Sequence, residues 1–112
     1  MRNADERIIE EVTSWPGVQA VNGERGELSL RLGRREIGHL HGERAAHFVF
    51  PKDLGAALRE QGRVGPHPVA PHKAAWAARG IASEADLLDV IELMRLNYDR
   101  LVTRYGLPEA VA

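Results

Sequence analysis

The segment from Val18 to Phe50 restricts the fold most strongly, because short alternating runs of apolar and polar residues are broken by glycine-containing turns. The turn sequences are NGERG, LGRR and HGER, and this spacing is typical of antiparallel hairpins. We therefore expect a meander of four strands, over Val18–Val21, Glu27–Leu32, Arg35–His41 and Arg44–Phe50.

Helical patterns flank this meander at both ends of the chain. Apolar residues recur at helical spacing from Ile8 to Trp15, before a stop at Pro16 and Gly17. A longer stripe follows Ser83, a predicted N-cap with an acidic residue three positions on. Between the meander and this stripe we expect a short helix at 51–62, an extended proline-rich loop at 63–73 and a strand at 74–81.

These elements predict one α+β domain over residues 1–112, in which an antiparallel meander sheet carries the N- and C-terminal helices on one face. The 112 residues contain no cysteine, which excludes disulfides and thiolate chemistry within this sequence. Neither an apolar run of about 20 residues nor a signal-peptide pattern is present, so we expect a soluble cytoplasmic protein without a membrane partner.

Two histidines, His39 and His41, lie two apart in the sequence GRREIGHLHGER. If Gly33–Arg34 and Gly42–Glu43 are both two-residue turns, the histidines point to the core side, where small neighbours leave room for a pocket. A three-residue turn would reverse this parity. The predicted core face holds Leu28, Leu30, Leu32, Ile37, Phe48, Phe50 and the two histidines, and the opposite face holds Glu27, Ser29, Arg31 and Glu36.

Three interpretations of the histidine pair remain open. The rings can be hydrogen-bonded and bind nothing, they can line an organic ligand pocket, or they can converge on a metal, because strand residues i and i+2 lie roughly 6.5–7 Å apart. A metal would need a third ligand, and we rank it below an organic ligand; no metal site is predicted. The candidate third ligands are His67, His72, Glu43 and Asp53.

The sequence PHKAAWAARG is a second candidate site, since Lys73, Trp76 and Arg79 could hold an anion beside an aromatic wall. In a regular strand, however, Trp76 and Arg79 point to opposite faces. We therefore favour a core or lid role for Trp76 and a solvated Arg79.

Several stretches, from about Glu10 to Arg104, resemble the small "luciferase domain" family in order and spacing: SWPGV, GRREIGHLHG, FPKDL, GRVGPHPVAP and LLDVIELMRLNYDRL. The resemblance implies no light-emitting activity and no established biochemical role. It places the family's motif histidines at His39, His41 and His67. The chain departs from the family pattern at Ala74 and Ala75, where a Ser/Asp-Gly pair is expected before Trp76.

The later half is also similar to MmcQ/YjbR-like domains, through Trp76 and the run from Asn97 to Arg100. That similarity implies a frataxin-like two-layer sandwich and a DNA-binding role. A nucleic-acid or protein-interaction module with a basic face is therefore our alternative, ranked second because the net charge is −1. The arginines of this face would be Arg31, Arg34, Arg35 and Arg44.

From the sequence we thus expect a small-molecule-binding domain with a pocket at the GHLHG hairpin, lined by His39, His41, His67 and Trp76. If the site is catalytic, an imidazole is the available general acid or base. The sequence identifies no cofactor, leaves enzymatic activity open and allows either a monomer or a homodimer.

Overall fold

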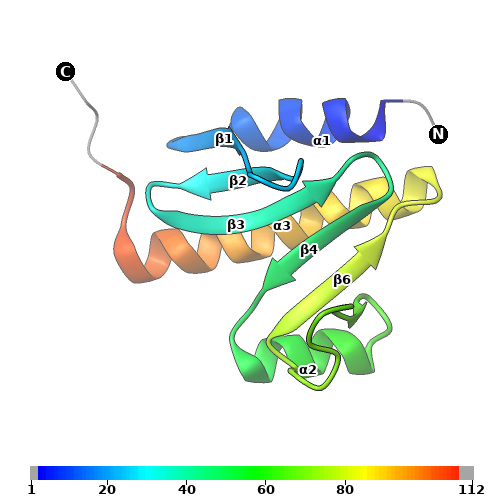
Figure 1. Cartoon of the computed structure of the whole chain (residues 1–112). Helices are drawn as coiled ribbons and strands as arrows, with labels where there is room; N and C mark the ends of the chain where they lie inside the picture. The colour runs from blue at the N-terminus through cyan, green and yellow to red at the C-terminus, as the bar shows by residue number, and fades with distance from the viewer. Residues whose placement is uncertain (1–2, 109–112) are drawn as a thin grey trace.

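The computed structural model describes residues 3–108, so the first two and last four residues of the expected 1–112 domain lie outside it. Three helices and six strands follow one another in the order drawn in Figure 1. They are α1 Ala4–Thr13, β1 Val18–Asn22, β2 Leu28–Leu32, β3 Arg35–His41, β4 Ala45–Val49, α2 Lys52–Glu60, β5 Gly65–Pro66, β6 Trp76–Gly80 and α3 Glu84–Tyr105.

The six strands form one antiparallel sheet in the order β1-β2-β3-β4-β6-β5. The expected α+β architecture is confirmed. The sequence did not predict β5, a two-residue edge strand inside the proline-rich segment, where Gly65 pairs with Ala78. A proline fits there because an edge strand tolerates a missing N–H donor.

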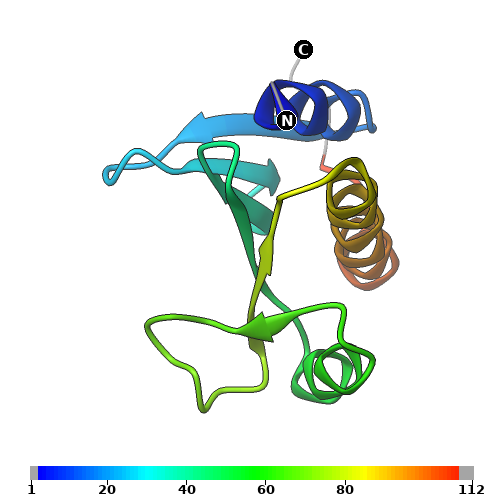
Figure 2. The same ribbon diagram turned by 90° about the vertical axis from the view of Figure 1, so that its right-hand side faces the viewer.

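One face of the sheet is buried beneath the helices. Helices α1 and α3 contact each other and share one core with the sheet. Figure 2 shows α2 and α3 on one side of β4 and β6, with the β5–β6 loop projecting from the other side. The fully buried large side chains are Ile8, Val12, Leu30, Ile37, Leu40, Phe48, Phe50, Leu87, Val90, Leu93, Met94 and Asn97.

The β2–β3 hairpin starts in the expected register and then departs from it. Leu32 pairs with Arg35 across a two-residue turn, in which Gly33 has a φ of 64° as a type II′ turn requires. Beyond this, the register shifts by one residue, so that Leu30 lies opposite Gly38 and Ile37 is the extra residue of a β-bulge.

The β3–β4 turn also differs from expectation, because it contains three residues, 42–44, rather than two. His41 therefore pairs with Ala45, and His39 pairs with His47. The bulge reverses the predicted parity of His39 and His41, and the longer turn then places His47 on their face while Phe48 stays in the core. His39 and His41 lie on the face of Ser29, away from the helices, and Leu40 takes the core side, where it is 1% exposed.

Asn97 of α3 holds the two strands where β3 and β4 separate. Its Nδ2 donates to the carbonyl oxygen of Ile37 at 2.8 Å and to that of Val49 at 3.2 Å. The Asn97 side chain is fully buried, and its Oδ1 accepts from Arg100 at 2.9 Å. The carbonyl of the bulged residue thus finds its partner on the helix rather than on a strand.

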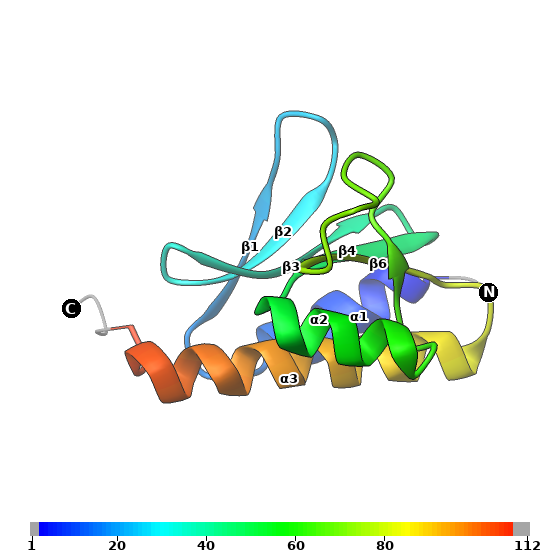
Figure 3. The ribbon, with the colours of Figure 1, turned by 90° about the horizontal axis from the view of Figure 1, so that it is seen from below.

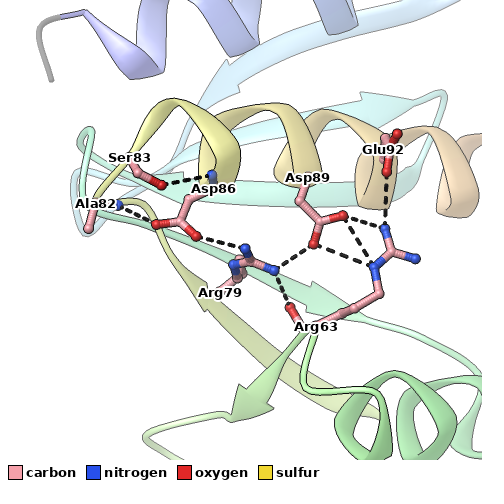
Figure 4. Close-up of polar contacts among 7 residues, drawn as sticks. All are labelled: Arg63, Arg79, Ala82, Ser83, Asp86, Asp89 and Glu92. Carbon is pink, nitrogen blue, oxygen red and sulfur yellow. Dashed lines mark hydrogen bonds and ion pairs between the residues drawn. The ribbon is translucent and has the colours of Figure 1, made fainter.

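An ionic network fastens the start of α3 to β6 and to the segment before β5, as Figure 4 shows. Arg79 donates to Asp86 at 2.7 Å and to Asp89 at 2.5 Å, and Arg63 also donates to Asp89. The predicted Ser83 cap is confirmed, since its hydroxyl accepts from the Asp86 amide. Arg79 is therefore an ion-paired side chain on the helix face and not the solvated residue expected from the sequence.

Candidate functional site

A pocket of about 570 Å³ lies on the sheet face that the helices leave open. The β1–β2 turn and the β5–β6 loop project from this side, away from α3, and form its two walls (Figure 3). Its floor comes from β3, β4 and β6. The lining residues are Glu24, Arg25, Glu27, Glu36, His39, His41, His47, His67, Val69 and Trp76.

Five rings contact one another in a chain across this pocket. The centroid of the His47 ring lies 5.1 Å from that of His39, 4.3 Å from that of His41 and 4.4 Å from that of His67. The His67 ring then meets the edge of Trp76 at 5.3 Å. The register explains the centre of the cluster, because His39 and His47 are direct cross-strand partners.

Glu36 orients the ring of His39. Its Oε1 lies 3.1 Å from His39 Nδ1 and also accepts from the Ser29 hydroxyl at 2.8 Å, which in turn accepts from Arg31 Nε at 3.0 Å. Burial raises the pKa of Glu36, but the hydrogen bonds from His39 and Ser29 outweigh it, so the net pKa lies below the ordinary value. Because an ionised carboxylate only accepts, Nδ1 of His39 carries a proton, and in the neutral ring Nε2 offers a lone pair.

The bulge at Ile37 makes this contact feasible. Residues three apart in a regular strand project to opposite faces, whereas one extra residue returns Glu36 to the face of His39. Gly38, beside the bulge, lets α3 approach closely, since a Cβ there would lie 2.8 Å from the Met94 sulfur. The same part of β3 therefore carries both the close packing against α3 and the bulge that turns Glu36 to the face of His39.

His67 is held in the opposite tautomer. Its Nδ1 accepts from the Val69 amide at 3.1 Å, so the proton of a neutral ring is on Nε2. The side chain reaches the pocket from the loop that follows β5, and the residue is 8% exposed. In their neutral rings, His39 thus offers an acceptor at Nε2 from the floor of the pocket, and His67 offers a donor at Nε2 from the β5–β6 loop.

Two histidines of the cluster, His47 and His67, resist protonation. Burial, followed by the neighbouring His41, His67 and His39, lowers the pKa of His47 to about 4. Burial and the same neighbours His39 and His41 also lower the pKa of His67. His47 is therefore neutral at pH 7, with a lone pair available for a donor or a cation.

Three of these histidines lie close enough together that they could hold a metal ion. His39, His47 and His67 each offer one ring nitrogen, and these nitrogens lie within 4.8 Å of one another. His39 and His47 come from the consecutive strands β3 and β4, and His67 comes from the β5–β6 loop, which α2 separates from β4 in the chain. The pairing of β4 with β6 brings this loop beside the hairpin.

The structure brings His39, His41, His67 and Trp76 together in one pocket, although on the face opposite to the one predicted. Sequence reasoning missed His47 and Glu36. A three-residue HGER turn would have placed His47 opposite His39, and the isolated Gly38 signalled an irregular strand. The other candidates His72, Lys73, Glu43 and Asp53 are exposed residues outside the pocket lining, and the ammonium of Lys73 lies 5.1 Å from the Trp76 ring centroid.

The arginines proposed for a nucleic-acid interface do not form one basic face. Arg34 and Arg35 lie at the β2–β3 turn and Arg44 lies at the β3–β4 turn, which are opposite ends of β3 (Figure 1). The Arg35 guanidinium lies 3.4 Å from the Tyr105 ring centroid, and Arg31 donates a hydrogen bond to the Ser29 hydroxyl.

Comparison with known proteins gives one assignment. No helix in the part of the chain that the structure describes is long and apolar enough to cross a membrane. No curated protein and no solved structure matches the chain. The family model of the Luciferase domain matches residues 34–97, which run from the β2–β3 turn to the buried asparagine of α3 and make up more than half of the chain. The chain belongs to the Luciferase domain family.

Proposed function

We propose that this domain binds a small organic molecule in the histidine-lined pocket. The supporting observation is the convergence of five rings, from β3, β4, β6 and the β5–β6 loop, on one concave surface. Its volume of about 570 Å³ falls within the range of roughly 300–1,000 Å³ usual for ligand sites.

The lining favours a flat ligand with both a hydrogen-bond donor and an acceptor. Trp76 and the imidazoles supply ring edges and faces for stacking. In their neutral rings, Nε2 of His39 accepts and Nε2 of His67 donates, so a heteroaromatic ring with complementary groups suits both histidines. The Glu36–His39 pair also has the arrangement of an oriented general base, should the bound molecule react.

The charged residues of the pocket lining argue against a nucleic acid as the occupant. Glu24, Glu27 and Glu36 line the pocket together with a single arginine, Arg25. Nucleic-acid binding depends on neutralising phosphates. This pocket has more carboxylates than arginines, and Arg34 and Arg35 lie at the opposite end of β3 from Arg44. Both features favour a neutral or cationic molecule.

Protein NMR with a library of planar heteroaromatic fragments tests the proposal on the full chain after treatment with EDTA. Bound fragments are expected to shift the amides of the strands beneath the pocket, and Trp76→Ala and His47→Ala should abolish those shifts. His72→Ala is the matched control, because His72 is exposed and lies outside the pocket lining. Fragments that bind wild type and His47→Ala equally well would refute the proposal.

A further inference from the structure

We propose that His39, His47 and His67 bind one divalent transition-metal ion of the zinc class, an inference that rests on the proposed function of the same pocket. The three side chains come from separate segments, and their ring nitrogens already lie within 4.8 Å of one another. Four-coordinate zinc at 2.0–2.1 Å from each nitrogen requires nitrogens roughly 3.4 Å apart. The three side chains would have to rotate toward one another to close that difference, and the pocket of about 570 Å³ has room for a fourth ligand.

The hydrogen bond to Glu36 prepares His39 for this role. Nδ1 donates to the carboxylate, so the Nε2 lone pair is the one free to bind a cation. A carboxylate behind a ligating imidazole fixes its tautomer and raises its basicity, which is the usual outer shell of a histidine metal site. Ser29 and Arg31 hold that carboxylate in place.

The charges around the cluster also favour a cation. Glu24, Glu27 and Glu36 line the pocket against one arginine, Arg25. A set of imidazole ligands suits zinc, copper or nickel rather than magnesium or calcium, which prefer oxygen ligands.

Metal binding must break the hydrogen bond between Val69 and His67. If Nδ1 of His67 binds the ion, that nitrogen has no lone pair left for the Val69 amide. If Nε2 binds it, Nδ1 carries the proton and can no longer accept. In either case the Val69 amide loses its partner, so its surroundings must change when the ion binds.

Titration of Zn²⁺ into the EDTA-treated full chain, without a histidine tag, tests the inference by calorimetry. We expect one ion per chain, binding weakened roughly 100-fold or more in His39→Ala and in His47→Ala, and no change in His72→Ala. Urea unfolding without metal shows whether each variant is folded, and His47→Gln provides a second, better-tolerated variant. An equal loss of Zn²⁺ affinity in His72→Ala would overturn the proposal. So would a folded wild-type protein that does not bind Zn²⁺ at millimolar concentration.

The amide of Val69 provides an independent readout. Stoichiometric Zn²⁺ is expected to shift its resonance more than those of the exposed β2–β3 turn, and an unmoved Val69 amide in zinc-loaded protein would refute the His67 assignment. Fragments that bind without zinc to a protein that rejects Zn²⁺ would leave the pocket proposal standing and remove the metal. If Zn²⁺ binds but no fragment binds to either the zinc-loaded or the metal-free protein, the metal site would stand and the proposed binding of an organic molecule would be refuted.

Discussion

Glu36 Oε1 lies 3.1 Å from His39 Nδ1, although the two residues are three apart in one strand. A regular strand would place them on opposite faces, and the extra residue Ile37 removes that separation. The bulge is held from the helix side by Asn97, whose amide donates to the Ile37 carbonyl. A core asparagine thus supports the geometry of a pocket on the other face of the sheet.

Glu36→Gln should weaken Zn²⁺ binding by about 10–100-fold, because outer-shell partners of ligating histidines typically have effects of this size. The amide cannot hold the His39 tautomer as a carboxylate does. Calorimetric titration measures the change. Glu43→Gln makes the same change of charge outside the pocket and should leave the affinity unaltered. Equal weakening of Zn²⁺ binding in both variants would mean that the lost negative charge matters and that the hydrogen bond to His39 does not.

Asn97→Leu should destabilise the protein by about 2–4 kcal/mol, because the carbonyls of Ile37 and Val49 would both lose a buried donor. Asn97→Asp keeps the shape but cannot donate, and it should also be destabilising. Urea unfolding gives both values. Glu92→Leu, at an exposed position of the same helix, should change stability by less than about 0.5 kcal/mol. A stable Asn97→Leu would mean that the bulge does not depend on this residue.

Gly55→Ala should destabilise the fold by about 1–3 kcal/mol or more, since a Cβ at Gly55 would lie 2.0 Å from the backbone oxygen of Ala74. Helix α2 would have to move away from the loop that leads to Trp76. The same loop is fastened by Arg59, which donates to the carbonyls of Lys73 and Trp76. Thermal unfolding measures the loss, and Ala56→Ser, at the exposed neighbour, should be nearly neutral.

Acid should weaken the network at the start of α3. The hydrogen bond from Arg79, followed by that from the Ala82 amide, lowers the pKa of Asp86 to about 2 from its ordinary value of 3.8. A carboxyl with a lowered folded-state pKa stabilises the fold fully above its unfolded value, and this contribution disappears as the pH falls from about 3.8 towards 2.

The corresponding measurement compares the unfolding free energies of wild type and Asp86→Asn from pH 7 to pH 3. The gap between them should be constant down to about pH 5 and should narrow below pH 4. A gap that stays unchanged at pH 3 would show that Arg79 does not stabilise the Asp86 carboxylate.

Most elements of this fold follow from local pattern, because glycine turns and helical stripes act over a few residues. The Ser83 cap and the Leu32–Arg35 turn pairing are examples, and both were predicted correctly. The side of the sheet to which the β3 histidines point was predicted wrongly. Each residue added between two turns moves the following side chains to the other face, and the bulge at Ile37 adds one. A bulge that is stabilised by Asn97, 60 positions away, leaves only a weak local signal, namely the glycine at position 38.

The candidate site was predicted in part. The residues His39, His41, His67 and Trp76 do meet in one pocket, but the prediction placed the hairpin histidines on the core side. Their actual meeting depends on the long-range pairing of β4 with β6 and of β5 with β6, which no local pattern specifies. His47 was missed because a two-residue turn would have turned it to the other face.

Histidine ring ¹⁵N NMR on the metal-free protein at pH 7.5 tests the central claim most directly, namely that the strand bulge makes Glu36 orient His39 within a ring cluster. The predicted spectrum shows His39 with its proton on Nδ1, His67 with its proton on Nε2, and cross-relaxation between the rings of His39, His47 and His67. A His39 ring protonated on Nε2, with no contact to His47, would contradict it.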